Sequence, residues 1–407
     1  MKKFKLVTFL GIRPDYIRME KLIKLLDAGQ KKNNYKHILV HSGQHYDPEL
    51  FGNFIKEFNI RKPDIDLGIG LSLKNGNKNN HASQLSLLSE RVFDMIKKIK
   101  PDAILYLGDT NTVLSSVVVA RSGVPIIHIE AGGRSFDWRM PEEKNRVIVD
   151  HLSDALYPYL DRYKDILLNE GIDDFRVKVI GNIVVDPIEN YKIQINKSDI
   201  LERLKVKEKG FILITLHREE NTSDKKILEN KLRSLLKFAK EKQMPIVFPL
   251  MPRVKNLVDK FKLNKILEDK QFIISKPLGF FDFIRCEQSA RLIVSDSGTV
   301  QEEALILGTP CVIARRSTER PETVWAGATI LEGIEGENTL YKKMKQAWSM
   351  KLNWDRNILN PNGGSPSERV FKDLVKKIKT GYFETSHNFQ KIKDNKFAKE
   401  SYCKTNV

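Results

Sequence analysis

The chain has 407 residues, 41% of them hydrophobic, which is enough for two domains with separate cores. No stretch of about 18 consecutive apolar residues occurs, so no membrane span is expected, and the short apolar run before Arg13 predicts a first strand rather than a signal peptide. The net charge of +17 comes from dispersed lysines, which predicts a solvated surface and no nucleic-acid partner. Three widely spaced cysteines fit neither a disulfide framework nor a zinc site, and predict a reduced, cytoplasmic protein.

Apolar runs alternate with amphipathic stretches over residues 1–186, which predicts a doubly wound, Rossmann-like α/β domain. The polar segment 73–80 predicts a loop. The strands and helices expected here are, in chain order, strand 5–10, helix 16–26, strand 37–41, helix 81–100, strand 103–107, helix 111–122, strand 124–129, helix 145–153, strand 155–157, helix 162–170 and a last segment at 177–180.

Carboxylates follow two of these predicted strands. Asp109 comes after 103–107, Glu130 comes after 124–129, and the next loop adds Glu142 and Glu143. Ligands of open α/β sheets bind outside the carboxyl ends of the strands, so these acids are expected at the mouth of a crevice. A single acid in such a place is as often a helix cap or a turn residue, but several together in a basic chain favour a site.

Two arginines lie near the predicted first helix. Arg13 and Arg18 would flank its N-terminus, where amide groups and guanidinium groups can share an anion. The sequence alone is equally consistent with ordinary surface arginines.

A second α/β domain is expected over 199–360, after a polar linker at 187–198. Its predicted strands are 211–215, 246–249, 272–275 and 292–295, and the last leads into SDSGTVQEE at 295–303. A strand, a glycine turn and a helix start make a suitable anion seat, and Glu303 lies one turn on, able to bind sugar hydroxyls. A plain N-cap role for the serine is the alternative.

The chain is expected to end with two more helices, at 338–350 and 367–379. The segment NPNGGSP at 360–366 separates them, and the last helix is expected to pack back on the first domain. Residues 380–407 are polar and rich in lysine, which predicts a frayed tail.

Seven motifs, in this order and spacing, resemble the non-hydrolysing UDP-N-acetylglucosamine 2-epimerase family. They are GIRP at 11–14, GDTNT at 108–112, HIEAG at 128–132, PEEKNR at 141–146, LHREEN at 216–221, SDSGTVQEE at 295–303 and STERPE at 317–322. The resemblance implies a GT-B-like fold of two Rossmann-like domains, with the nucleotide sugar in the cleft between them. It also implies a homodimer, an isomerase activity on UDP-N-acetylglucosamine, and no metal or cofactor.

Motif positions carry the family's site residues over to this chain. The resemblance implies catalytic roles for Asp109, Glu130, Glu142 and His217. It implies that the residues which hold phosphate, ribose, sugar and uracil are Arg13, Arg18, Leu278, Phe283, Ser297, Gly298, Thr299, Glu303 and Arg320.

The implied reaction inverts C2 by eliminating UDP to give a 2-acetamidoglucal and then adding UDP back. Elimination needs a carboxylate base, stabilisation of positive charge at C1, and cations or amides that receive the diphosphate. The three carboxylates can meet the first two needs, and the sequence does not assign base and acid among them. His217 is expected to be an acid/base or a diphosphate partner.

Two departures bear on the substrate and its regulation. The loop 134–140 is shorter than in the glucosamine branch and resembles the branch that acts on other UDP-linked N-acetyl sugars of capsule or lipopolysaccharide pathways. Gln44 and His45 match a family activator motif, but Asp47 and Met251 do not, so activation by a second UDP-N-acetylglucosamine is predicted to be weak or absent. A hydrolysing 2-epimerase, a GT-B glycosyltransferase and a nucleotide-sugar sensor are the remaining alternatives.

Overall fold

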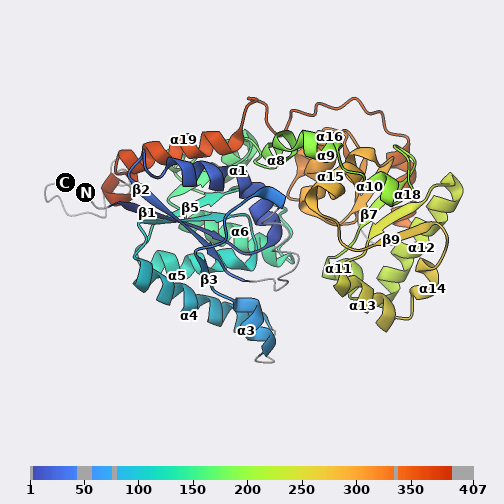
Figure 1. The fold of residues 1–407 in the computed structure, drawn as a ribbon, viewed down its shortest axis with the longest axis horizontal. Coiled ribbons are helices and arrows are strands. Elements are labelled where there is room, and N and C mark those ends of the chain that lie inside the picture. The colour runs from blue at the N-terminus through green and yellow to red at the C-terminus, as the bar shows by residue number, and fades with distance from the viewer. Residues whose placement is uncertain (1–2, 44–56, 76–79, 334–337, 387–407) are drawn as a thin grey trace. The chain divides into compact units, whose positions relative to one another are not determined.

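The computed structural model describes residues 3–43, 57–75, 80–333 and 338–386. The chain divides into two compact units, a first unit of residues 1–186 with 364–407 and a second unit of residues 187–363. Each unit contains a six-stranded parallel sheet flanked by helices (Figure 1). The predicted fold class, two doubly wound α/β domains, is confirmed. No helix among the described residues is long and apolar enough to cross a membrane.

The sheet of the first unit has the strand order β3-β2-β1-β4-β5-β6. Its strands are β1 (Phe4–Leu10), β2 (Tyr35–His41), β3 (Ile65–Asp66), β4 (Ala103–Leu107), β5 (Ile126–Ile129) and β6 (Ala155–Tyr157). All five residues of β4 are buried, because helices cover both faces of a parallel sheet. Its helices are α1 (Arg13–Gly29), α3 (Ile69–Asn75), α4 (His81–Ile99), η1 (Asn111–Ser115), α5 (Ser116–Arg121), α6 (Pro141–Leu152), α7 (Asp161–Asn169), η2 (Asp174–Arg176), α8 (Val185–Asn190, which runs into the second unit), α19 (Pro366–Lys379) and η3 (Tyr382–Ser386).

Helices α1 and α19 lie side by side on one face of this sheet, and α4 and α5 lie on the other (Figure 1). The final helix therefore packs on the first unit. Tyr157 of β6 donates a hydrogen bond of 2.8 Å to Asp373 of α19, and Tyr382 donates one of 2.8 Å to the carbonyl of Asp154. The expectation of a frayed tail is wrong up to Ser386, because these aromatic side chains fix the start of the tail.

The sheet of the second unit has the strand order β12-β11-β10-β7-β8-β9. Its strands are β7 (Ile212–Thr215), β8 (Ile246–Pro249), β9 (Phe272–Ser275), β10 (Leu292–Ser295), β11 (Cys311–Ile313) and β12 (Thr329–Leu331). Its helices are α9 (Lys192–Asn196), α10 (Ile200–Arg203), α11 (Glu219–Thr222), α12 (Lys225–Lys242), α13 (Pro252–Lys260), α14 (Asn264–Leu267), α15 (Phe280–Ser289), α16 (Gly298–Leu307), α17 (Pro321–Trp325) and α18 (Thr339–Trp348).

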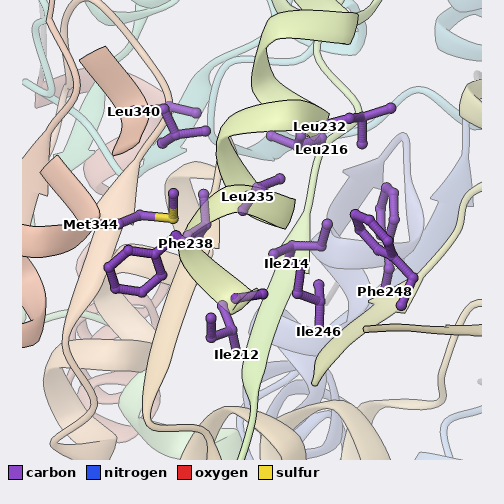
Figure 2. Close-up of a cluster of buried hydrophobic side chains, with 14 of the residues drawn as sticks. Ile212, Ile214, Leu216, Leu232, Leu235, Phe238, Ile246, Phe248, Leu340 and Met344 are labelled. Carbon is purple, nitrogen blue, oxygen red and sulfur yellow. The ribbon is translucent and has the colours of Figure 1, made fainter. Parts of the chain in front are cut away.

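A buried apolar cluster holds α12 and α18 on this second sheet. Figure 2 shows Phe238 of α12 and Met344 of α18 close to strand side chains that include Ile212 and Ile246. The packing fixes β7 and β8 from one face, so that the loops at their carboxyl ends start from a rigid base.

Three expectations about local structure are wrong. The segment 187–198 is mostly helical, in α8 and α9, because Ile195 is buried and gives the short helices an apolar anchor. Residues 73–75 close helix α3 instead of belonging to a loop. Residues 177–180, expected as the last element of the first domain, contain only an isolated bridge between Val177 and Leu156.

The two sheets share one topology. In each, the first strand of the unit lies centrally, with two strands on one side of it and three on the other, so the winding reverses between β1 and β4 and between β7 and β10. Ligands of open α/β sheets bind at the carboxyl ends of the strands beside this switch point. Each unit therefore has one topologically favoured place for a ligand.

Candidate active site

The switch point of the first unit carries two of the predicted acids. Asp109 lies two residues after β4, and Glu130 directly follows the neighbouring strand β5. Glu130 has a φ of +74°, in the left-handed region that residues other than glycine rarely adopt. Such backbone strain is found mainly at functional sites, where the surrounding structure holds the residue in place. The strained residue here carries a carboxylate that is only 7% exposed.

Glu130 is paired with Arg18 of α1. The guanidinium contacts the Glu130 carboxylate and also donates a hydrogen bond of 3.0 Å to Asp15. Burial raises the pKa of Asp15, although Arg18 and the amides of Gly11 and Ile12 favour its charged form. The turn GIRP thus acts through Asp15, which holds the first helix and Arg18 against the strand end that carries Glu130.

A second arginine is paired with Asp109. Arg146 of α6 donates hydrogen bonds of 2.9 Å and 2.5 Å to the Asp109 carboxylate and one of 2.6 Å to Glu143. Glu143 also accepts the backbone amides of Ser135 and Phe136, at 3.0 Å and 2.8 Å. The short loop 134–140 is therefore tied, through Glu143 and Arg146, to the carboxylate of Asp109.

Glu142 lies in the first turn of α6, because Pro141 begins this helix four residues earlier than predicted. Its side chain is half-buried, and the described part of the chain offers it no hydrogen bond or ion pair. Arg13 is the first residue of α1, at the same edge of the sheet. Burial lowers the pKa of Arg13, although the negative charge of Glu57 acts in the opposite direction. The first unit therefore brings together Arg18, Asp109 and Glu130 through contacts with neighbours.

His217 follows β7 at the switch point of the second unit. Its Nδ1 lies 3.0 Å from Asp296, which also accepts the amides of His217 and Arg218 and a hydrogen bond from Asn221. Burial opposes the charge of Asp296, but His217 and these donors lower its pKa to about 2. The imidazole is 48% exposed, so its edge away from Asp296 is accessible to a ligand.

The predicted anion seat follows β10 in the same unit. Ser297 is the N-cap of α16 by its backbone, yet its hydroxyl makes no capping hydrogen bond to the helix. Ser297, Gly298 and Thr299 are half-buried. A Cβ on Gly298 would lie 2.6 Å from a carboxylate oxygen of Glu319, so a larger residue here would displace that side chain. The start of α16 keeps amide groups and a hydroxyl that can bind a phosphate.

Two buried ion pairs and one carboxyl pair surround α16. Arg320 lies 2.6 Å from Glu302, and Arg315 lies 2.7 Å from Glu319. Glu303 is 7% exposed and interacts with the fully buried Glu287 of α15. Burial first, and then the charge of Glu303, raise the pKa of Glu287 well above its ordinary value, which favours the neutral form of this carboxyl group.

Leu278 and Phe283 lie at the N-terminal end of α15, both partly buried against the apolar cluster that includes Val300 of α16. Gln44, His45 and Asp47 lie outside the described residues, and Met251 is the exposed N-cap of α13. The described residues contain no group of three or more His, Cys, Asp or Glu side chains that could hold a metal ion.

Sequence reasoning missed the partners of the named residues: Asp15, Arg146, Glu287, Asp296 and Glu302. All but Glu287 lie within a motif or directly after one, so the sequence held a signal for these, but only the structure shows which charge each one meets. Two α/β units, each with ionic side chains at its switch point, define a nucleotide-binding enzyme of two Rossmann-like domains.

Comparison with known proteins identifies the family. The family described as UDP-N-acetylglucosamine 2-epimerase matches residues 27–373. The chain is 37% identical to the UDP-N-acetylglucosamine 2-epimerase of Methanococcus maripaludis, over 91% of this chain and 98% of the relative. It is 32% identical to the UDP-2,3-diacetamido-2,3-dideoxy-D-glucuronate 2-epimerase of Pseudomonas aeruginosa, over 91% of this chain and 99% of the relative.

A solved structure has the same fold. The crystal structure of Methanocaldococcus jannaschii UDP-GlcNAc 2-epimerase in complex with UDP-GlcNAc and UDP matches with a TM-score of 0.83 and 34% identity, over 92% of this chain and 100% of that one. The chain belongs to the UDP-N-acetylglucosamine 2-epimerase family, which is a family of isomerases, and the resemblance stated from its motifs is confirmed.

Proposed function

We propose that this protein is a non-hydrolysing UDP-N-acetylglucosamine 2-epimerase, which converts UDP-N-acetylglucosamine to UDP-N-acetylmannosamine. The observation that carries the proposal is the pair of arginine-bound carboxylates, Asp109 and Glu130, at the switch point of a family member. The relatives named above act on UDP-linked N-acetyl sugars.

The proposed chemistry breaks the C1–O and C2–H bonds and forms both again, with the new C2–H bond on the opposite face of the sugar. A carboxylate takes the C2 proton, the C2–H electrons form the C1–C2 double bond, and UDP leaves C1 with the electrons of the C1–O bond. UDP then adds back to C1, while C2 accepts a proton on the opposite face. Asp109, Glu130 and Glu142 are the candidates for proton transfer and for stabilising positive charge at C1.

The second unit supplies most of the candidates for binding UDP, and Arg13 and Arg18 come from the first unit. Ser297, Gly298 and Thr299, with the amides of α16, can receive the diphosphate as negative charge develops on it. Arg13, Arg18 and Arg320 can add positive charge, and Glu303 can accept hydrogen bonds from hydroxyls of the ribose. His217, whose orientation is fixed by Asp296, is a candidate acid/base or diphosphate partner.

Incubation with UDP-N-acetylglucosamine in deuterated water, followed by NMR of the products, tests the proposal. Deuterium at C2 in a gluco/manno mixture that still carries UDP is the expected result. Free sugar and UDP would show the hydrolysing reaction instead. Asp109→Asn should abolish C2 exchange and leave UDP affinity within about threefold, whereas Asp165→Asn, at an exposed position on α7, should change neither.

A second candidate substrate is another UDP-N-acetyl sugar, such as a deoxy or uronic one. It is favoured by the short loop 134–140 and by the similarity to the enzyme from Pseudomonas aeruginosa. No turnover of UDP-N-acetylglucosamine, together with C2 exchange in a 6-deoxy or uronic UDP-sugar, would change the substrate and keep the mechanism.

We infer that the protein acts as a homodimer. Leu85 and Phe93 of α4 and Val117 of α5 are 41%, 43% and 46% exposed, and the two helices contact one another. Apolar side chains on adjacent helices favour burial against a second copy. Light scattering should give twice the chain mass, and Phe93→Asp should shift the mass toward the monomer.

We also infer a cytoplasmic enzyme that supplies polysaccharide synthesis. Cys286 and Cys311 are free and buried, and burial raises the pKa of Cys286 to about 12, so neither is adapted to disulfide exchange. Cell fractionation and the loss of surface polysaccharide in a deletion strain test this inference.

A further inference from the structure

The buried side chain of His128 joins the strands that carry two of the candidate catalytic acids. His128 lies in β5, two residues before Glu130, and its neighbour in β4 is Tyr106. Its imidazole is fully buried. Nε2 lies 2.8 Å from the carbonyl oxygen of Gly108, the residue directly before Asp109, and Nδ1 lies 2.7 Å from Asp150 of α6.

Both partners of this imidazole accept hydrogen bonds. The Gly108 carbonyl has no proton to give. Asp150 also accepts Arg134 at 2.7 Å and the amide of Gly132 at 3.0 Å, and although burial opposes its charge, Arg134 and His128 lower its pKa. Both ring nitrogens thus face acceptors at hydrogen-bond distance, and each can satisfy its acceptor only as a donor, which is the arrangement of an imidazolium.

The charges around this imidazolium balance. Asp150 lies between His128 and Arg134, and Arg134 forms a bidentate pair with Glu170, at 2.9 Å and 2.7 Å. His128, Asp150, Arg134 and the half-buried Glu170 therefore form one network. A buried charge is stable when it is paired and hydrogen-bonded in this way.

The network fixes the two turns that carry the acids. Gly108 has a φ of +69°, and a Cβ there would lie 3.1 Å from the Glu130 carboxylate, so the turn of Asp109 runs directly past Glu130. The same Asp150 that orients His128 holds the amide of Gly132 in the turn after Glu130. One buried carboxylate thus restrains both turns.

We propose that His128 and Asp150 are positioning residues, a buried imidazolium–carboxylate pair that sets the place of Asp109 relative to Glu130. This rests on the proposed function, in which the two acids act on one sugar. Displacing a reacting group by about 1 Å can cost roughly 100-fold in rate, so a network without substrate contact can control catalysis.

The chain offers a matched control in the same sheet. His37 of β2 is equally buried, with Nδ1 at 2.7 Å from Asp27 and Nε2 at 2.9 Å from the hydroxyl of Thr8. The Thr8 hydroxyl can donate or accept, so this pair does not require two ring protons. His37 contacts neither turn of the candidate site.

The test combines NMR of the wild-type protein with two variants. In ¹⁵N-histidine spectra at pH 7.5, both ring nitrogens of His128 should carry protons, and a single ring proton would overturn the proposal. His128→Gln, which keeps much of the volume but no charge, should lower kcat for C2 exchange by roughly 100-fold and leave KM and UDP affinity within about threefold. His37→Gln should leave kcat unchanged.

An unchanged kcat in folded His128→Gln, or equal losses in the two variants, would refute the positioning role. If His128→Gln does not fold, the wild-type spectrum and the kcat of Asp150→Asn decide. Absence of C2 exchange in the wild-type protein would instead refute the proposed function, while the ¹⁵N spectrum would still report on the network.

Discussion

Asp296 allows a quantitative prediction about pH and stability. Its pKa falls from 3.8 to about 2 on folding, because the hydrogen bonds and charge around His217 outweigh its burial. A carboxyl group whose pKa is lower in the folded state stabilises the fold at any pH above its pKa in the unfolded state. This stabilisation is lost as the pH falls through its pKa in the folded state. At about 1.4 kcal/mol per unit, the shift is worth about 2 kcal/mol at pH 7, and roughly half of this is lost by pH 3.

Denaturant unfolding of the wild-type protein and Asp296→Asn at several pH values tests this. At pH 7 the variant should be less stable than the wild-type protein by at least about 2 kcal/mol, the contribution of the lost charge. The new side-chain amide would also place its NH2 group against Asn221 or the backbone N–H of His217, which are themselves donors, and this adds to the loss. The difference should shrink as the pH falls from 5 to 3. Asp259→Asn, at an exposed site on α13, is the control. A difference that does not change with pH would refute the assigned charge of Asp296.

Three further predictions concern single positions. Gly132→Ala should lower the free energy of unfolding by at least about 2 kcal/mol, because a Cβ would lie 2.3 Å from the Tyr163 carbonyl. Gly123 has a similar φ but open space around it, so Gly123→Ala should cost only about 1 kcal/mol. Equal costs in the two variants would contradict this. Glu287→Gln should gain thermal stability relative to wild type as the pH rises from 5 to 9, since a raised pKa makes the buried acid costly at high pH; a constant difference would contradict this. Ser297→Ala should weaken UDP binding, measured by calorimetry, by about three- to tenfold with little change in kcat, and unchanged affinity would argue against the anion seat.

Short apolar strands were the easiest elements to predict. The bounds of β4, β8 and β10, whose residues are all buried, and of the edge strand β9 are those expected from the sequence, because turn residues delimit each apolar run. The strands β3, β11 and β12 were not predicted. They have two or three residues each, too few to show a period. β3 pairs with β2 and β11 pairs with β10, which are longer, and β12 pairs in turn with β11.

The candidate site was predicted residue by residue but not as a network. The sequence pointed to Asp109, Glu130 and His217 by their places after apolar runs and within motifs. It did not show that Arg146, one helix turn after Glu142, reaches back to Asp109, or that Asp296 orients His217. These pairs join residues 37 and 79 positions apart, and no local pattern encodes such a distance.

The sequence by itself determined the family, the two α/β halves and the residue types of the site, because motifs and apolar periodicity are local properties. Only the tertiary structure decided which charges meet. The strand order brings the turns after β4 and β5 together. Burial makes every unpaired charge costly, so Arg18, Arg146 and His128 each lie beside a carboxylate that accepts a hydrogen bond from them. The carboxylates that the sequence named are thus held by partners that only the fold could supply.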